Sequence, residues 1–95
     1  MLFRSKRKNI LHMNSKDITP RNDKGEKHGY WEYYYYNGQL YSKGKYVNGN
    51  KHGSWEWYYE NGQLWAKGNY VNGKQHGYWE WYNYNGQLKE KTYYI

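Results

Sequence analysis

Three histidines recur at a constant interval, and histidine is well suited to metal binding and to proton transfer near neutral pH. His28, His52 and His76 are 24 residues apart. If each interval spans two strands of a sheet, equivalent positions lie about 9.5 Å apart. Zinc requires each nitrogen at about 2.0–2.1 Å, so one ion cannot join two of these histidines. We interpret them as loop residues and expect no metal site and no cofactor.

Three glutamates recur at the same interval, at Glu32, Glu56 and Glu80. Carboxylate pairs act as acid and base in glycoside hydrolysis, but this spacing also separates the glutamates, and each has a lysine as its expected neighbour. No serine or threonine accompanies a base and an orienting group. The sequence contains no cysteine and therefore no thiol nucleophile. We predict that the protein is not an enzyme and has no small-molecule substrate.

These residues belong to a longer repeat, which fixes the architecture that must position them. The block from His52 to Gln75 occurs nearly three times, and the same offsets return Trp31, Trp55 and Trp79. We place a repeat domain at residues 25–95. Its repeats cover 28–51, 52–75 and 76–95, the last being truncated.

Two Asn-Gly pairs occur in each of the first two repeats, as at Asn37-Gly38 and Asn48-Gly49, and one occurs in the truncated third. Asn-Gly between aromatic and β-branched runs is a strong hairpin signal, because both residues accept a positive φ. The sequence predicts an all-β fold, an elongated, twisted, open antiparallel meander of tandem 24-residue hairpins with about six strands.

A two-residue turn at Asn37-Gly38 sets the register of the first hairpin. It places Trp31 opposite Gly44, Glu32 opposite Lys43 and Tyr35 opposite Leu40. Later copies repeat these pairs, and a large ring folded over a facing glycine is a known register device. Each glutamate is thus paired with the lysine of its own hairpin.

Alternation along the strands assigns two faces. Tryptophan, leucine and glycine positions should form the packed face, and tyrosine, glutamate and lysine positions the wetter one. Residues 88–95 carry polar replacements, including Lys89 and Glu90. We interpret them as a capping strand that discourages edge-to-edge pairing.

Tyrosine and tryptophan must supply the core, because only 37% of the residues are hydrophobic and 15 Tyr and 6 Trp are present. The net charge of +7 is concentrated in residues 1–24, which we predict to be a basic, flexible arm. Met13 is an alternative start that would remove four basic residues of the arm. Those residues are Arg4, Lys6, Arg7 and Lys8.

No apolar run is long enough for a membrane span or a secretory signal. We therefore expect a cytoplasmic protein, in a bacterial cell or, for a viral protein, in the host cytoplasm.

The recurring pattern Gly-x-Trp-x-x-Tyr-x-x-Asn-Gly-Gln-Leu, followed by Gly-x-Tyr-x-Asn-Gly-x-x-His-Gly, resembles the bacterial and viral variant of the MORN repeat over about residues 25–95. The resemblance implies stacked hairpins in an open twisted sheet and a binding or scaffolding module without catalysis. Variants of this kind are described as antitoxin-like components that neutralise a partner protein, and some MORN proteins bind membranes or dimerise.

A ladder of rings and cations on the wetter face provides the candidate binding residues. A protein partner suits such a surface best, since aromatic residues are enriched at interfaces. Self-association through a sheet edge is a related possibility. The alternative is nucleic acid or an anionic membrane, bound through the arm and the rings. The candidate residues are Tyr34, Tyr41, Lys43, Tyr58, Trp65, Lys67 and Tyr82.

Overall fold

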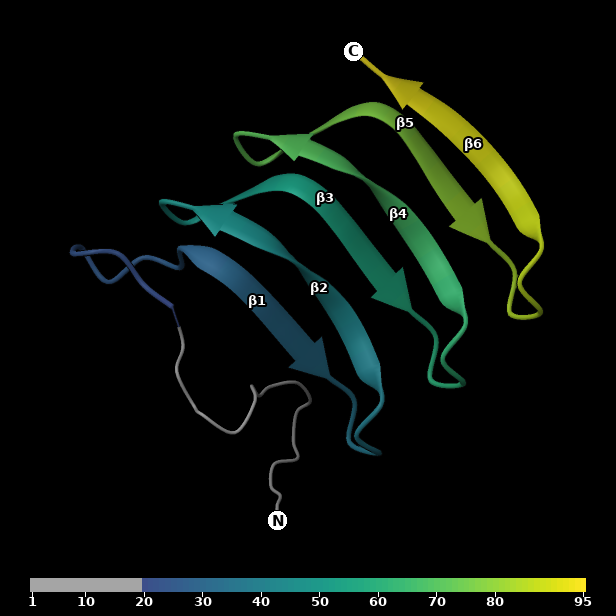
Figure 1. Cartoon of the computed structure of the whole chain (residues 1–95). Helices are drawn as coiled ribbons and strands as arrows, with labels where there is room; N and C mark the ends of the chain where they lie inside the picture. Colours follow the sequence, from purple (N-terminus) through teal and green to yellow (C-terminus); the bar gives the residue numbers. More distant parts are fainter. Residues whose placement is uncertain (1–19) are drawn as a thin grey trace.

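The computed structural model describes residues 20–95, which form one antiparallel sheet in which each strand lies beside its neighbour in the sequence (Figure 1). This confirms the predicted all-β meander. No helix in this part of the chain is long and apolar enough to cross a bilayer. The strands are β1 (Gly29–Tyr34), β2 (Leu40–Val47), β3 (Asn50–Tyr58), β4 (Leu64–Val71), β5 (Lys74–Tyr82) and β6 (Leu88–Tyr94).

The Asn-Gly pairs between repeats form tight two-residue turns. Asn48 and Gly49 have φ values of 49° and 88°, so both central residues lie in the left-handed region. Such turns match the twist of the flanking strands. The turn at Asn72 and Gly73 repeats this geometry, with φ values of 51° and 83°.

The Asn-Gly pairs within repeats form a longer turn, so the predicted two-residue turn at Asn37-Gly38 is wrong. The N–H of Gly38 donates to the Tyr35 carbonyl at 2.9 Å, and the N–H of Tyr35 donates to the Gln39 carbonyl at 2.9 Å. The loop therefore has three residues, and within it only Gly38 has a positive φ. Oδ1 of Asn37 accepts the Gln39 N–H at 2.9 Å, which holds Asn37 in the turn without a left-handed backbone.

The extra loop residue shifts the pairing near the turn. Tyr34, and not Tyr35 as predicted, lies opposite Leu40. A β-bulge that leaves Tyr41 without an opposed residue then restores the expected register. Because opposed residues share a face, Leu40 lies on the side of Tyr34, and its predicted place beside the tryptophans is wrong.

Beyond the bulge, the predicted pairs are confirmed, with Trp31 opposite Gly44 and Glu32 opposite Lys43. However, the ring that covers Gly44 belongs to Trp55 of the next hairpin. A Cβ on Gly44 would be 2.2 Å from the Trp55 ring, and one on Gly68 would be 2.2 Å from the Trp79 ring. Trp55 and Trp79 therefore each reach back onto the preceding hairpin.

The face that carries Trp31, Trp55 and Trp79 is called the Trp face below. Aromatic rings cross it in a continuous row, each meeting the next edge to face at centroid distances of 5.2 to 6.4 Å. Edge-to-face contact is a preferred aromatic geometry, so the row forms the core and binds repeat to repeat. Its members are Trp31, Tyr46, Trp55, Tyr70, Trp79 and Tyr94.

A turn over residues 20–27 packs against Trp31, the first of the three repeated tryptophans. Trp55 and Trp79 instead pack against the preceding hairpin. Arg21 forms a bridge with Lys27, and the Pro20 carbonyl accepts Nε1 of Trp31 at 3.0 Å. Residues 20–24, included in the predicted arm, form part of this turn. The arm residues Arg4, Lys6, Arg7 and Lys8 lie outside the described residues.

Candidate interaction surface

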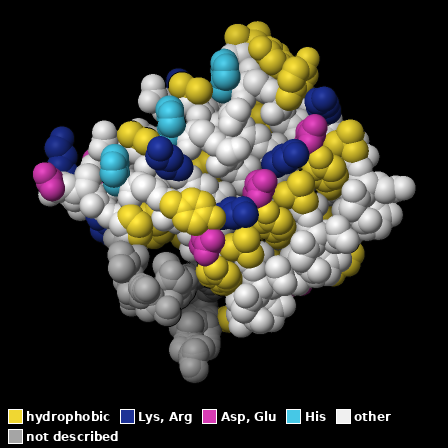
Figure 2. Space-filling model, in the orientation of Figure 1, with side chains coloured by type: hydrophobic (Ala, Val, Ile, Leu, Met, Phe, Trp, Pro, Cys, Tyr) yellow, Lys and Arg dark blue, Asp and Glu magenta, His cyan; other side chains and the backbone are white. Residues whose placement is uncertain are grey.

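The face opposite the tryptophans, called the charged face below, carries a row of charged residues of alternating sign, one from each strand. Lys45 of β2 lies on the same face, opposite Tyr30. Figure 2 shows this row crossing the sheet diagonally. Direct strand pairing aligns every neighbouring pair in it. The row is Glu32, Lys43, Glu56, Lys67, Glu80 and Lys91.

The ion pairs in this row mainly join successive repeats. Nζ of Lys43 lies 3.7 Å from a carboxylate oxygen of Glu56, in the next hairpin. Lys67 has the same 3.7 Å contact with Glu80, which also receives Lys91 at 3.9 Å. The predicted strand register is confirmed, since each glutamate lies opposite the lysine of its own hairpin. Of the three lysines in the row, only Lys91 also forms an ion pair with that glutamate. Such surface pairs contribute at most about 1 kcal/mol each.

Tyrosine hydroxyls also donate hydrogen bonds to the glutamates of this row. Tyr34 donates to Glu32, and Tyr30 donates to the other oxygen of the same carboxylate. Tyr58 and Tyr82 donate in the same way to the glutamates of their own repeats. Burial, followed by the hydrogen bond and charge of the neighbouring carboxylate, raises the pKa of Tyr58.

Five predicted binding residues therefore lie together on the charged face, but their polar groups are engaged within the sheet. Their hydroxyls and ammonium groups contact glutamates in the same row. What remains for a partner is ring surface and the outer carboxylate edges. These five are Tyr34, Lys43, Tyr58, Lys67 and Tyr82.

Tyr41 and Trp65 do not join that group, and their predicted place on the charged face is wrong. The bulge turns Tyr41 toward Tyr35, with ring centroids 5.1 Å apart, and Trp65 packs 6.1 Å from Tyr59. The Tyr35 hydroxyl in turn donates to the Tyr58 carbonyl at 2.7 Å. These rings support the turns between strands of a repeat.

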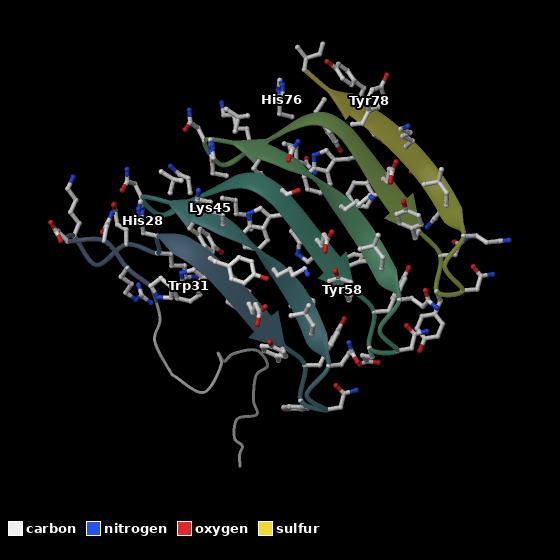
Figure 3. All side chains as sticks on the ribbon, in the orientation of Figure 1. His28, Trp31, Lys45, Tyr58, His76 and Tyr78 are labelled. Atoms are coloured by element: carbon white, nitrogen blue, oxygen red, sulfur yellow. The ribbon has the colours of Figure 1, made fainter. Side chains whose placement is uncertain are left out.

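Two of the three repeated histidines lie within strands and not in loops. His52 lies in β3 and His76 in β5, so their assignment to loops is wrong, whereas His28 precedes β1. Figure 3 labels His28 and His76 at opposite ends of the line of histidines that Figure 2 shows at one border of the charged face. Nδ1 of His28 accepts the Asn48 N–H at 3.1 Å. Within residues 20–95, no three metal-ligating side chains are grouped.

An exposed aromatic pair at the C-terminal end was missed by reasoning from the repeat. Tyr78 and Tyr93 are directly opposed, with ring centroids 4.8 Å apart, and they are 63% and 57% exposed. Nζ of Lys91 lies 4.8 Å from the centre of the Tyr78 ring. The second repeat has Ser54 and Asn69 at the same positions, so this departure between copies was the available signal.

This aromatic pair lies beside an open sheet edge. Within residues 20–95, β6 has a neighbouring strand on one side only (Figure 1). Tyr78 projects beside β6 in Figure 3. Further exposed apolar side chains belong to the same hairpin, with Tyr84 and Leu88 at its turn and Ile95 beyond the far end of β6.

A comparison with protein families identifies the repeat. The model described as MORN repeat variant matches residues 27–48, 51–72 and 75–95. Neither the curated proteins nor the solved structures that were compared include a significant match to this sequence.

Proposed function

The chain belongs to the MORN repeat variant family, a non-enzymatic module whose repeats generally mediate protein or membrane interactions, and we propose that it docks a protein partner without catalysis. The docking surface is the C-terminal end of the charged face together with the edge of β6. The exposed pair of Tyr78 and Tyr93 is the observation that carries this proposal.

The chemistry of this surface favours a protein. Tyrosine supplies a large apolar ring with a polar tip and is enriched at protein interfaces. β6 has no described strand on its outer side. In this proposal its backbone there forms hydrogen bonds with an added strand, despite the capping role expected from Lys89 and Glu90, and neighbouring side-chain positions provide specificity. The ammonium of Lys91 is held by Glu80 and by the Tyr78 ring, so the aromatic pair is kept in place for a partner.

Nucleic acid and anionic membranes find less support on this face. The three lysines of the charged row balance its three glutamates, and each of these lysines contacts a glutamate. Lys45, on the same face, is exposed and forms no ion pair among the described residues. A phosphate-binding groove requires cations that are free to replace counterions. Binding that falls steeply between low and moderate salt would contradict protein docking and support this alternative.

The repeat itself supplies the test. Replacing Tyr78 with Ser and Tyr93 with Asn introduces the residues of the second repeat at the same positions. We expect this double variant to lose a partner captured from source cells at moderate salt, while its thermal unfolding remains cooperative. The matched control is Tyr30→Ser, the equivalent change in the first repeat, where Tyr30 is also exposed. Capture that survives in the double variant would contradict the proposal.

The partner could also be a second copy of the chain. In that case sedimentation would show a dimer that the same double variant dissociates. Dimerisation that is insensitive to these substitutions would place the contact elsewhere.

An antitoxin-like role extends the proposal, since docking at this surface would then neutralise the partner. Its support is the family resemblance together with an exposed surface of fixed geometry. The activity of the captured partner should fall on addition of the protein and recover with the double variant. A partner that is captured but keeps full activity would limit the function to scaffolding.

A further inference from the structure

A cleft of about 570 Å³ opens on the Trp face, on the side of the sheet away from the proposed docking surface. It lies between the first and second repeats, beside the turns that contain Gly49 and Gly73. The aromatic walls belong to Tyr46 and Tyr70, and the cationic groups to Lys27 and Lys51.

The two lysines are held over aromatic rings and have no carboxylate partner among residues 20–95. Nζ of Lys51 lies 5.3 Å from the centre of the Trp55 ring and 5.5 Å from that of Tyr70. It donates no hydrogen bond to any described residue. Since an ammonium group has three donors, all of those of Lys51 are available to a ligand.

Lys27 is positioned in the same way one repeat earlier. Its Nζ lies 5.1 Å from the Trp31 ring centre and 5.2 Å from that of Tyr46, and it donates to the Tyr33 hydroxyl at 3.0 Å. A side-chain hydrogen bond of Lys27 also acts on the pKa of Tyr46, so at least one of its three donors remains for a ligand. The carboxylate of the adjacent Glu26 instead accepts Nδ2 of Asn22 at 2.8 Å.

The electrostatics of the cleft favour an added negative charge. Burial, together with the like charge of Lys27, lowers the pKa of Lys51. A carboxylate placed between the two ammonium groups would offset both penalties. No described acidic side chain forms an ion pair with either lysine.

We propose that this cleft binds an acidic peptide segment whose carboxylates lie three residues apart. Lys27 and Lys51 occupy equivalent positions two strands apart, a separation of about 9.5 Å. A polyproline II segment returns every third side chain to the same side with a rise of about 3.1 Å per residue. Two carboxylates three residues apart in such a segment therefore match the two lysines, and aromatic walls suit this conformation.

Phosphate is a poorer match for the same cleft. Phosphate groups are typically cradled by backbone N–H groups at nests and helix ends. Here the N–H of Gly49 donates to the Lys27 carbonyl at 2.8 Å, and that of Gly73 to the Lys51 carbonyl at 2.9 Å. The turn amides are thus committed to joining the repeats, leaving ammonium groups as the main donors.

The direct test titrates the protein with the peptide Gly-Glu-Pro-Pro-Glu-Gly and follows tryptophan fluorescence, because Lys51 lies over Trp55. The matched peptide has glutamine in place of both glutamates and should not bind. Lys51→Gln introduces the residue found at Gln75 in the third repeat. We expect it to weaken binding of the acidic peptide about tenfold, the loss typical of one charge-assisted hydrogen bond.

Two control variants distinguish binding at this cleft from a general effect of charge and from binding at the docking surface. Lys45→Gln removes an equal charge at an exposed position labelled in Figure 3, and it should leave the affinity within about twofold, as expected for a screened surface charge. The double variant at Tyr78 and Tyr93 should bind the peptide normally, so the two proposals can fail independently. Lys27→Gln provides a second test if Lys51→Gln does not fold.

Three results would overturn the inference. The first is equal affinity of the Lys51→Gln and Lys27→Gln variants and the unsubstituted protein for the acidic peptide. The second is equal affinity of the unsubstituted protein for the acidic peptide and for the glutamine peptide. The third is preferential binding of inorganic phosphate, or of vesicles containing phosphatidylserine, over the acidic peptide.

Discussion

The indole of Trp55 lies so close over Gly44 that a Cβ on the glycine would be 2.2 Å from Cδ2 and Cε2 of the ring. Trp55 is 1% exposed, and its Nε1 donates to the Lys45 carbonyl at 2.9 Å. Gly44 belongs to the first repeat and Trp55 to the second. This contact therefore stacks one hairpin on the next, in addition to the strand pairing between them.

Substitution of Gly44 by alanine should destabilise the fold by about 2–3 kcal/mol, because the Trp55 ring must move or the strands must separate. The backbone at Gly44 has no positive φ, so the cost arises from the ring contact. Urea unfolding followed by tryptophan fluorescence measures the loss.

Thr92→Ala is the matched control for this prediction. Thr92 occupies the equivalent position of the third repeat, opposite Trp79, and no later tryptophan covers it within the described chain. Its substitution should change stability by only about 0.5 kcal/mol. Equal losses at both positions would contradict the role assigned to the ring.

Asn48 provides a test of the two-residue turn, since its φ of 49° is unfavourable for most residues with a Cβ. Asn48→Ala should destabilise the protein by about 1–2 kcal/mol. Asn48→Gly should recover most of that loss, because glycine adopts this conformation freely. Denaturant midpoints of the two variants decide the matter, and a glycine variant as unstable as the alanine variant would contradict this explanation.

The sequence was sufficient to predict the strand register beyond the turns, for a physical reason. The three-residue loop at Tyr36–Gly38 and the bulge at Tyr41 each shift the pairing by one residue, and the two shifts cancel. Trp31 therefore faces Gly44 as predicted, although the turn was assigned incorrectly. Asn-Gly fits both turn types, so the dipeptide alone could not distinguish them.

Contacts between repeats were harder to predict than contacts within a hairpin. Each ring could fold over the glycine before or after it, and both lie in adjacent strands. The presence of Thr92 at the third copy of the glycine position was the discriminating signal, since no described tryptophan follows it. Periodicity likewise emphasised residues shared by all repeats and passed over Tyr78 and Tyr93, which distinguish the last repeat.

Glu80 should contribute to the stability of the protein against acid. The Tyr82 hydroxyl, followed by the charges of Lys67 and Lys91, lowers the pKa of this carboxyl from its usual value of 4.5. A lowered pKa means that its contribution is complete above pH 4.5 and is lost as the pH falls through the pKa of the folded protein. As the pH falls below 4.5, the free energy of unfolding of the Glu80→Gln variant should therefore decrease by less than that of the unsubstituted protein.

Carboxyl titration by NMR measures the same effect directly. Tyr82→Phe removes the largest cause and should raise the pKa of Glu80 toward 4.5. An unchanged titration in this variant would assign the shift to the lysines alone.

The tyrosines of the charged face should in turn limit stability at alkaline pH. Burial and its hydrogen bond to Glu32 raise the pKa of Tyr30 to about 12, and burial with the Glu56 carboxylate raises that of Tyr58 from its usual value of 10.0. A raised pKa provides stability that is complete below pH 10.0 and is lost as the pH rises, since the unfolded chain releases the proton more readily.

Glu56→Gln removes the negative charge beside the Tyr58 hydroxyl, so the pKa of Tyr58 should fall while burial keeps it above the usual value. The titration of Tyr46, whose pKa is raised by burial and by Tyr33, should not move. Absorbance of the tyrosinate form, with Tyr58→Phe to assign the affected group, measures both. Because the proton is then bound less tightly in the folded state, the Glu56→Gln variant should also lose stability less steeply above pH 10.0. A steeper loss would contradict the proposed link between this carboxylate and the alkaline limit.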